Sequence, residues 1–209
     1  MSKSISQYVC QQCGRTSPRP LGRCPACGAW GAMVEEKIQP AAAKKAVRGL
    51  SGRSQPQRLA EIAGDAEERL ALPIGEFARV LGGGIVPGSI VLVGGDPGIG
   101  KSTLLLQMAL QMAQQDLVLY VSGEESERQI KMRANRLLRP ADGNSIDLPH
   151  NLFLVTETNL NTILEHISAV QPRLVIVDSI QTVYMPELDS SAGTVTQVRE
   201  SASRLRECA

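Results

Sequence analysis

From residue 85 onward, short apolar runs alternate with longer stretches of mixed apolar and polar residues. Short runs bounded by polar and turn residues are typical of buried parallel strands, and the longer stretches are typical of helices that cover them. The predicted strands are Ile90–Val93, Leu117–Val121, Leu152–Val155 and Leu174–Val177. The predicted helices are Lys101–Gln115, Ser126–Arg139 and Asn161–Val170, with a further apparent helix at Val195–Cys208. This alternation predicts an α/β fold with a mainly parallel sheet.

The first 60 residues lack this alternation. Residues 1–36 contain four of the five cysteines. From Lys37 to Arg58 the chain has six positive charges, no acid, two prolines and few bulky apolar residues, which is typical of a flexible linker. The sequence therefore predicts a small module at 1–36, a basic linker at 37–60 and a larger domain at 61–209.

The net charge of +1 conceals an uneven distribution. Residues 1–60 carry ten Lys and Arg against two Glu, a net charge of +8, whereas residues 61–209 carry 12 basic and 19 acidic residues, a net charge of −7. A basic arm on an acidic domain indicates contact with a polyanion, although a solvated tail has the same composition. The arm therefore leaves a nucleic-acid contact and a simple tether equally open.

Two classes of protein do not fit this sequence. No apolar run approaches the ~18 residues of a membrane span, and Met1–Val9 has no apolar signal core. We therefore expect a cytoplasmic protein without a membrane partner. Cysteines in such a reducing compartment are better interpreted as metal ligands or free thiols than as disulfides.

A glycine-rich loop directly follows the predicted strand Ile90–Val93 and precedes the helix that begins at Lys101. In such a loop backbone N–H groups surround the phosphates of a nucleotide, the lysine contacts the β and γ oxygens, and the Ser102 hydroxyl is placed to ligate Mg²⁺. The sequence therefore predicts binding of ATP or GTP. The predicted nucleotide-binding residues are Gly95, Asp96, Pro97, Gly98, Ile99, Gly100, Lys101, Ser102 and Thr103.

Acidic residues follow two of the predicted strands. Asp178 ends the run Leu174–Val177, as expected of the carboxylate that holds Mg²⁺ or its water ligands opposite a phosphate loop. Glu124 and Glu125 lie at the exit of the strand that follows the first helix, where one of them can orient and deprotonate a water molecule. A favourable charge at a helix start explains the other acid. The pattern alone does not decide between Glu124 and Glu125.

The four N-terminal cysteines form two Cys-x-x-Cys pairs, each followed by a glycine. Such pairs supply the four thiolates of a tetrahedral Zn²⁺ site, and so short a segment needs the metal to fold. We therefore predict one structural zinc ribbon with the ligands Cys10, Cys13, Cys24 and Cys27. A redox dithiol is the alternative, but it needs only one pair. We expect Trp30 to pack on the second pair rather than to stack on a base.

Four segments and the cysteine ribbon together resemble the RadA (Sms) family of bacterial DNA repair proteins. The segments are RVLGGGIVPGS at 79–89, GGDPGIGKST at 94–103, YVSGEES at 120–126 and LVIVDSIQT at 174–182. The resemblance covers essentially the whole chain and implies a RecA-like P-loop NTPase core. It also implies zinc at the four cysteines, Lys101 and Ser102 at the phosphates and Mg²⁺, and Asp178 as the metal-side acid. Glu124 becomes the favoured water-activating carboxylate.

The resemblance also implies a function. Members of this family are ring-forming, DNA-dependent ATPases that drive branch migration in recombinational repair, together with single-stranded or branched DNA and other recombination proteins. Residues 184–194 correspond to the first DNA-facing loop of the RecA-like fold. Family members continue through a further motif and a Lon-protease-like domain, so we expect this chain to be truncated and poorly active. A scaffold that ATP switches without moving DNA is the alternative function.

Overall fold

The structure is a computed structural model that describes residues 5–38, 58, 69–139 and 147–209. It divides into two compact units, Met1–Glu68 and Arg69–Ala209. Strand β3 (Met33–Ile38) of the first unit ends two residues past the predicted end of the module. Most of the predicted linker and its boundary with the larger domain lie outside the described residues, so that division stays a prediction.

The first unit contains a small antiparallel sheet. Strand β1 (Ile5–Cys10) pairs with β2 (Thr16–Ser17) on one edge and with β3 (Met33–Ile38) on the other. Both Cys-x-x-Cys segments turn in the same way, because the amide of the following glycine donates to the first cysteine's carbonyl, at 2.8 Å for Gly14 and 2.9 Å for Gly28. These glycines have φ of 73° and 77°, a left-handed conformation that glycine adopts without a steric penalty.

The second unit is built on a parallel sheet of three strands. Strand β4 (Val118–Ser122) lies between β5 (Leu152–Thr156) and β6 (Leu174–Asp178). The register places Ser122 opposite both Thr156 and Asp178. The carboxyl ends of the three strands therefore meet at one edge of the sheet, where ligands bind in folds of this class. The prediction of an α/β fold with a parallel sheet is confirmed.

Five helices are described, all in the second unit: α1 (Gly75–Val80), α2 (Lys101–Met112), α3 (Glu127–Leu138), α4 (Leu160–Val170) and α5 (Val195–Cys208). Helix α3 begins with a capping box, in which the side chains of Ser126 and Gln129 satisfy each other's backbone amides. The Asn159 side chain caps α4 in the same position. Among the described residues, no helix has the length and apolar character that a membrane span requires.

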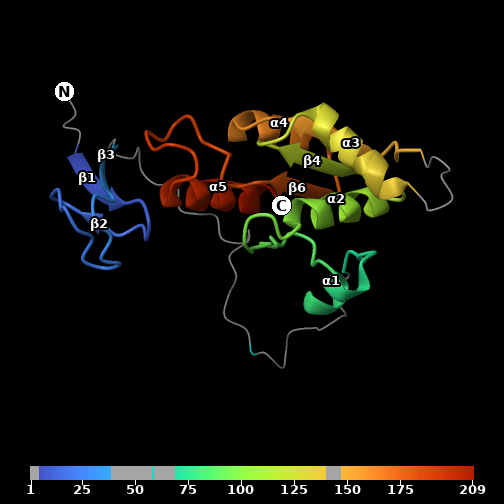
Figure 1. Cartoon of the computed structure of the whole chain (residues 1–209), viewed down its shortest axis with the longest axis horizontal. Helices are drawn as coiled ribbons and strands as arrows, with labels where there is room; N and C mark the ends of the chain where they lie inside the picture. Colours follow the sequence, from blue (N-terminus) through green and yellow to red (C-terminus); the bar gives the residue numbers. More distant parts are fainter. Residues whose placement is uncertain (1–4, 39–57, 59–68, 140–146) are drawn as a thin grey trace. The chain divides into compact units, whose positions relative to one another are not determined.

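Apolar residues fill both faces of the sheet. On one face α2 packs on β4 and β6, and α3 packs on α2 and β5, in a cluster that includes Leu106, Leu110 and Tyr120. On the other face α4 packs on β4 over Leu119 and Val121, with its Ile163 fully buried, and α5 packs on α4. Figure 1 shows α4 and α2 on opposite sides of β4 and β6. The body is therefore a three-layered α/β sandwich, and its core fixes the strands whose ends carry the predicted acids.

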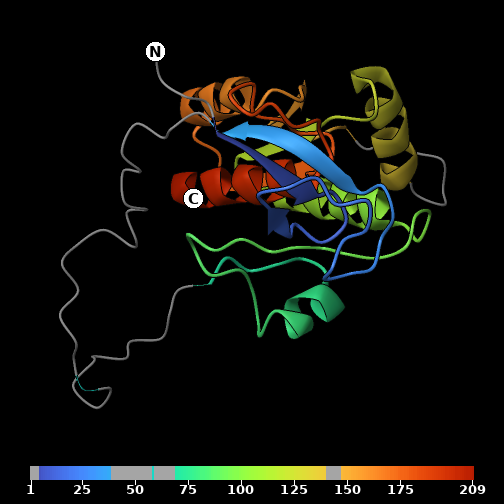
Figure 2. The same cartoon turned by 90° about the vertical axis from the view of Figure 1, so that its left-hand side faces the viewer.

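The prediction of a strand at Ile90–Val93 is wrong in this structure. The segment contains no strand, and Figure 2 shows the green trace before α2 running extended and without an arrow. Ile90 is 47% exposed and Leu92 is 82% exposed. A strand needs a neighbour that accepts its backbone hydrogen bonds, and in the described sheet β6 pairs only with β4. An apolar run predicts a tendency to form a strand, but not the partner.

Candidate functional site

The four predicted cysteine ligands converge on one point. Their sulfur atoms all lie within 4.8 Å of one another. The Sγ atoms of Cys10 and Cys27 are 3.6 Å apart, and those of Cys13 and Cys24 are also 3.6 Å apart. A tetrahedron with Zn–S bonds of about 2.3 Å has sulfur–sulfur edges of about 3.8 Å. The cluster therefore fits a four-thiolate Zn²⁺ site, which contains one pair from each glycine turn.

The surroundings of the cluster act differently on two of its thiols. The backbone N–H of Cys27 lowers the pKa of the Cys24 thiol to about 6, whereas desolvation and hydrogen bonding to the neighbouring sulfur atoms raise the pKa of the Cys13 thiol to about 12. Cys10 and Cys24 are buried and the other two ligands are exposed. Four protein ligands close the tetrahedron and leave no position for a substrate, as in structural rather than catalytic zinc sites.

The expectation that Trp30 packs on the second cysteine pair is wrong. Trp30 is 78% exposed, although it lies only three residues after Cys27. Its backbone pairs with that of Arg23 in an antiparallel bridge, and the Arg23 guanidinium lies 5.9 Å from the ring centroid. The ring therefore forms a cation–π pair at the surface instead of filling a core.

The predicted phosphate loop lies at the N-terminus of α2, as its mechanism requires. Gly100 is the N-cap, with φ of 101°, and Gly98 has φ of 79°. The Lys101 ammonium donates to the carbonyls of Gly95 at 2.8 Å and Asp96 at 2.9 Å, so its charge is held against the loop's own backbone. The exposed amides of this turn and the helix dipole favour an anion at this end of α2.

Asp178 ends strand β6 and accepts a hydrogen bond from a buried tyrosine. The Tyr120 hydroxyl donates to Oδ2 of Asp178 at 2.7 Å. Burial and this carboxylate raise the pKa of Tyr120, so the phenol stays protonated and remains a donor at neutral pH. Tyr120 thereby fixes the orientation of one oxygen of Asp178. The sequence pattern gave no signal for this contact between residues 58 positions apart.

The two adjacent glutamates differ in what they contact. Glu125 forms an ion pair with Arg133 of α3, and its backbone amide donates to the Ser122 hydroxyl at 3.1 Å. Glu124 is exposed and accepts a hydrogen bond of 2.8 Å from the Ser179 hydroxyl, next to Asp178. Glu125 therefore holds the start of α3, whereas Glu124 has a carboxylate that a water molecule can reach. This difference supports Glu124 as the water-activating acid.

Gly123 joins the ends of β4 and β6. Its amide donates to the Asp178 carbonyl at 3.1 Å. A Cβ atom at position 123 would lie only 2.7 Å from Cβ of Thr182, whose hydroxyl donates to the Ser179 carbonyl at 2.8 Å. Only a residue without a side chain allows the two loops to approach this closely. The glycine therefore sets the distance between the loop of Glu124 and that of Asp178.

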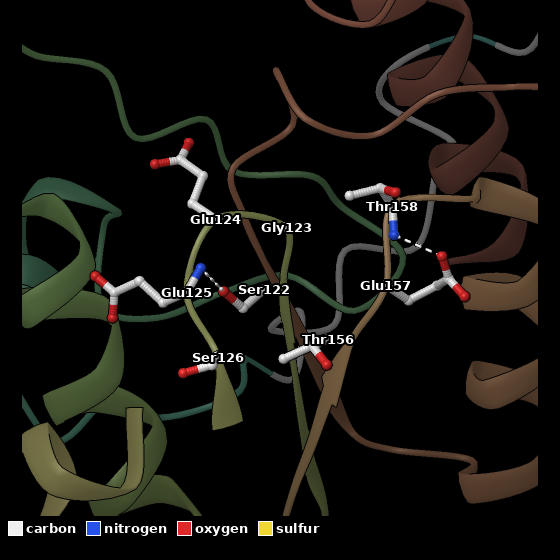
Figure 3. A pocket seen from close by; sticks show the side chains of 8 residues that line it. All are labelled: Ser122, Gly123, Glu124, Glu125, Ser126, Thr156, Glu157 and Thr158. Atoms are coloured by element: carbon white, nitrogen blue, oxygen red, sulfur yellow. Dashed lines mark hydrogen bonds between the residues drawn. The ribbon is translucent and has the colours of Figure 1, made fainter. Parts of the chain in front are cut away.

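A cleft of about 290 Å³ opens between the ends of β4 and β5. Figure 3 shows Glu157 across it from Glu124 and Glu125. The backbone amides of Asn159 and Thr158 donate to Glu157, at 2.8 Å and 2.7 Å, and lower the pKa of its carboxyl group. Glu157 is thus held as a carboxylate that organises the turn before α4. The residues that line the cleft are Ser122, Gly123, Glu124, Glu125, Ser126, Thr156, Glu157 and Thr158.

The loop at 184–194, which the family resemblance assigns to DNA, is anchored at both ends. The Tyr184 amide donates to the Thr158 carbonyl at 2.9 Å. Gln197 of α5 is fully buried, accepts from the Met185 amide at 2.9 Å and donates to the Ser190 carbonyl at 2.8 Å. The loop contains Glu187 and Asp189 and no basic residue, so phosphate attraction within this loop cannot come from its own side chains.

The structure brings some predicted site residues together and leaves others apart. Glu124, Asp178 and their hydrogen-bond partners share the carboxyl edge of the sheet. Helix α2 packs on β4 and β6, and Figure 1 shows its N-terminal end on the side to which these two arrows point. Among the described residues, no hydrogen bond or ion pair joins the loop at 95–103 to Glu124 or Asp178. Ser102 and Asp178 are the residues that could hold Mg²⁺.

Comparison with known proteins agrees with the presence of two units in the chain, a metal-binding ribbon and an α/β body. The model of the AAA domain family matches residues 55–209, and that of a rubredoxin metal binding domain matches residues 8–35. The chain is 45% identical to DNA repair protein RadA of Streptococcus pyogenes over 210 residues and to that of Bacillus subtilis over 213 residues, in both cases over 100% of this chain. It spans 44% and 45% of those proteins, less than half their length. The resemblance drawn from the motifs is confirmed.

Proposed function

Since this chain belongs to the AAA domain family, we propose that it hydrolyses ATP in recombinational DNA repair. The observation that carries the proposal is the common position of three elements: a phosphate loop at the start of α2 and two acids, Glu124 and Asp178, at the edge of the sheet on which α2 packs. The similarity of this whole chain to part of the DNA repair proteins named RadA supports the repair context. In this proposal hydrolysis drives branch migration or the processing of branched DNA.

Each residue has a separate task in this reaction. The amides of residues 95–103 bind the phosphates and Lys101 neutralises charge on the β and γ oxygens, for which it exchanges its present carbonyl partners. Ser102 and Asp178 would hold Mg²⁺, which would neutralise charge on the phosphates. Tyr120 keeps Asp178 oriented through its hydrogen bond. Glu124 accepts the proton of the attacking water, and Ser179 positions its carboxylate.

The partners of this activity follow from the same relatives. We propose single-stranded and branched DNA as the nucleic acid, other recombination proteins as partners, and a homo-oligomeric ring as the assembly. The acidic loop at 184–194 supports contact through backbone amides or bases rather than through phosphate attraction.

The test is ATP turnover with and without single-stranded DNA, measured for this chain and for a chain extended to the length of its relatives. In the extended chain Lys101→Ala should abolish nucleotide binding, whereas Glu124→Gln should preserve binding and reduce turnover by roughly 100-fold or more. Glu125→Gln is the matched control, with turnover reduced less than in Glu124→Gln. Loss of turnover in Glu125→Gln alone would exchange the two roles. ATP-dependent assembly without DNA-stimulated turnover would favour the scaffold function instead.

A further inference from the structure

The ribbon presents one large aromatic side chain to solvent. Trp30 is the only tryptophan of the chain and is 78% exposed. Burying such a ring is worth several kcal/mol in general, so a small module that needs all its apolar area has reason to bury it. The ribbon instead holds the ring at the surface beside Arg23, whose guanidinium lies 5.9 Å from the ring centroid.

The pair is fixed to the metal-binding turn. Arg23 and Trp30 pair through their backbones, immediately before Cys24 and three residues after Cys27. The next hydrogen bond of the same hairpin runs from the Cys24 amide to the Ala29 carbonyl at 2.9 Å. Arg23 is also held from its side chain, because its Nε donates to the Gly28 carbonyl at 2.9 Å. Both side chains therefore project from one hairpin that the zinc ligands close.

The arginines of the ribbon indicate what the pair binds. Arg15, Arg19 and Arg23 are exposed, and among the described residues none of them forms an ion pair. An aromatic ring beside an arginine that no acid pairs, on a module with further exposed arginines, is a combination that binds single-stranded nucleic acid, since a base stacks on the ring while cations meet the backbone. A protein-docking tryptophan sits instead within a desolvated apolar patch. The Trp30 ring is bordered instead by the charged guanidinium of Arg23.

We propose that Trp30 and Arg23 form a stacking platform for one base of a single-stranded nucleic acid. The base lies on the exposed indole, and the guanidinium of Arg23 contacts the adjacent phosphate. The site belongs to the ribbon, needs no nucleotide at the phosphate loop and does not depend on the proposed ATPase activity. Because all base types have a π face, the site binds single strands without a strong sequence preference.

The single tryptophan makes the test direct. Zinc-loaded protein is titrated with a short oligothymidylate, and indole fluorescence is followed without ATP. We expect saturable quenching, and Trp30→Ala should weaken oligonucleotide affinity by roughly 5- to 150-fold, measured by anisotropy of a labelled strand. Trp30→Phe should retain most of the affinity. Arg23→Gln should lower the salt dependence of binding by about one phosphate contact. Zinc content, measured for each variant, shows that the ribbon is intact.

The outcomes separate this site from the ATPase. Absence of quenching, or unchanged oligonucleotide affinity in zinc-loaded Trp30→Ala, would overturn the proposal. Binding of another protein that Trp30→Ala removes, with oligonucleotide affinity unchanged, would also overturn it and identify a docking surface. ATP turnover without DNA should be the same in Trp30→Ala and the parent. The oligonucleotide-binding result can therefore be interpreted even if the ATPase proposal fails.

Discussion

The ribbon and the α/β body keep their folds by different means. In the ribbon, the buried apolar residues among those described are Val9, Cys10 and Cys24. The sulfur atoms of the four cysteines lie within 4.8 Å of one another. In the body, two apolar clusters cover both faces of a three-stranded sheet. The ribbon therefore depends on metal coordination, whereas the body depends on burial of side chains.

The same difference determines where each unit carries its chemistry. The ribbon uses its polar ligands for structure, so its binding groups must project outward, as Trp30 does. The body uses its apolar strands for structure and leaves their polar carboxyl ends available for the site that we propose at Glu124 and Asp178. A unit held by a core can have a concave site within it, whereas a unit held by a metal offers its surface.

Removal of zinc should have the largest effect and should be confined to the ribbon. Coordination supplies folding free energy on the order of 10 kcal/mol in small zinc modules, so chelation or Cys24→Ser should unfold the ribbon. Tryptophan fluorescence reports the ribbon, because Trp30 is the only tryptophan. Far-UV circular dichroism reports the body, where the described helices lie. A large loss of helix signal on chelation would contradict the claim that the body folds independently of the ribbon's zinc.

Truncation of a core residue should act on the body alone. Ile163 is fully buried between α4 and the sheet, and Ile163→Ala should lower the free energy of unfolding by about 2–5 kcal/mol. Urea unfolding followed by circular dichroism measures the change. The indole emission and zinc content should stay as in the parent, and Met132→Ala on the exposed face of α3 is the matched control with little effect. A cost below about 1 kcal/mol for Ile163→Ala would contradict the assigned core.

Gly123→Ala tests the junction of β4 and β6 within the body. An added methyl group would lie 2.7 Å from Cβ of Thr182, so the two loops must separate, at a cost of about 1–3 kcal/mol. Nucleotide hydrolysis should fall more than nucleotide binding, because the displaced groups are Glu124 and Asp178. The double variant Gly123→Ala with Thr182→Ala removes the Thr182 hydroxyl, which is the atom nearest the added methyl group, and so relieves the contact in part. No recovery of stability in the double variant would show that the clash lies elsewhere.

Glu157 gives the smallest effect and a dependence on pH. Its folded-state pKa is lowered by the amides of Asn159 and Thr158, so its stabilisation is present above the unfolded pKa and is lost as pH falls through the folded value. Glu157→Gln should therefore unfold at lower urea than the parent at neutral pH, and the difference should vanish in acid. If the stability difference between the parent and Glu157→Gln grew in acid, the pKa of Glu157 would be raised rather than lowered by folding.

Much of the body could be predicted from the sequence because its signals are local. Ser126 and Gln129 predict the start of α3, and the runs at 117–121, 152–155 and 174–177 are strands in the structure to within one residue. The run at 90–93 has the same composition but forms no strand, since pairing depends on a neighbour that composition does not specify.

The site could be predicted less completely, for the same reason. The cysteine pairs and the phosphate loop are continuous in sequence, so their spacing identifies them. The contact of Tyr120 with Asp178 and the fit of Gly123 against Thr182 join residues distant in sequence through tertiary packing. Trp30 was misplaced because apolar character predicts burial, whereas its hairpin holds the ring outward.

The central claim is that the body holds a nucleotide site at residues 95–103 that does not depend on the ribbon. Its direct test is calorimetric titration of ATP with Mg²⁺ into this chain with and without zinc, and into the Lys101→Ala variant. The account predicts binding of one ATP per chain with the same affinity in the zinc-loaded and zinc-free protein, and no measurable binding by Lys101→Ala. Equal ATP affinity in Lys101→Ala and the parent would contradict it.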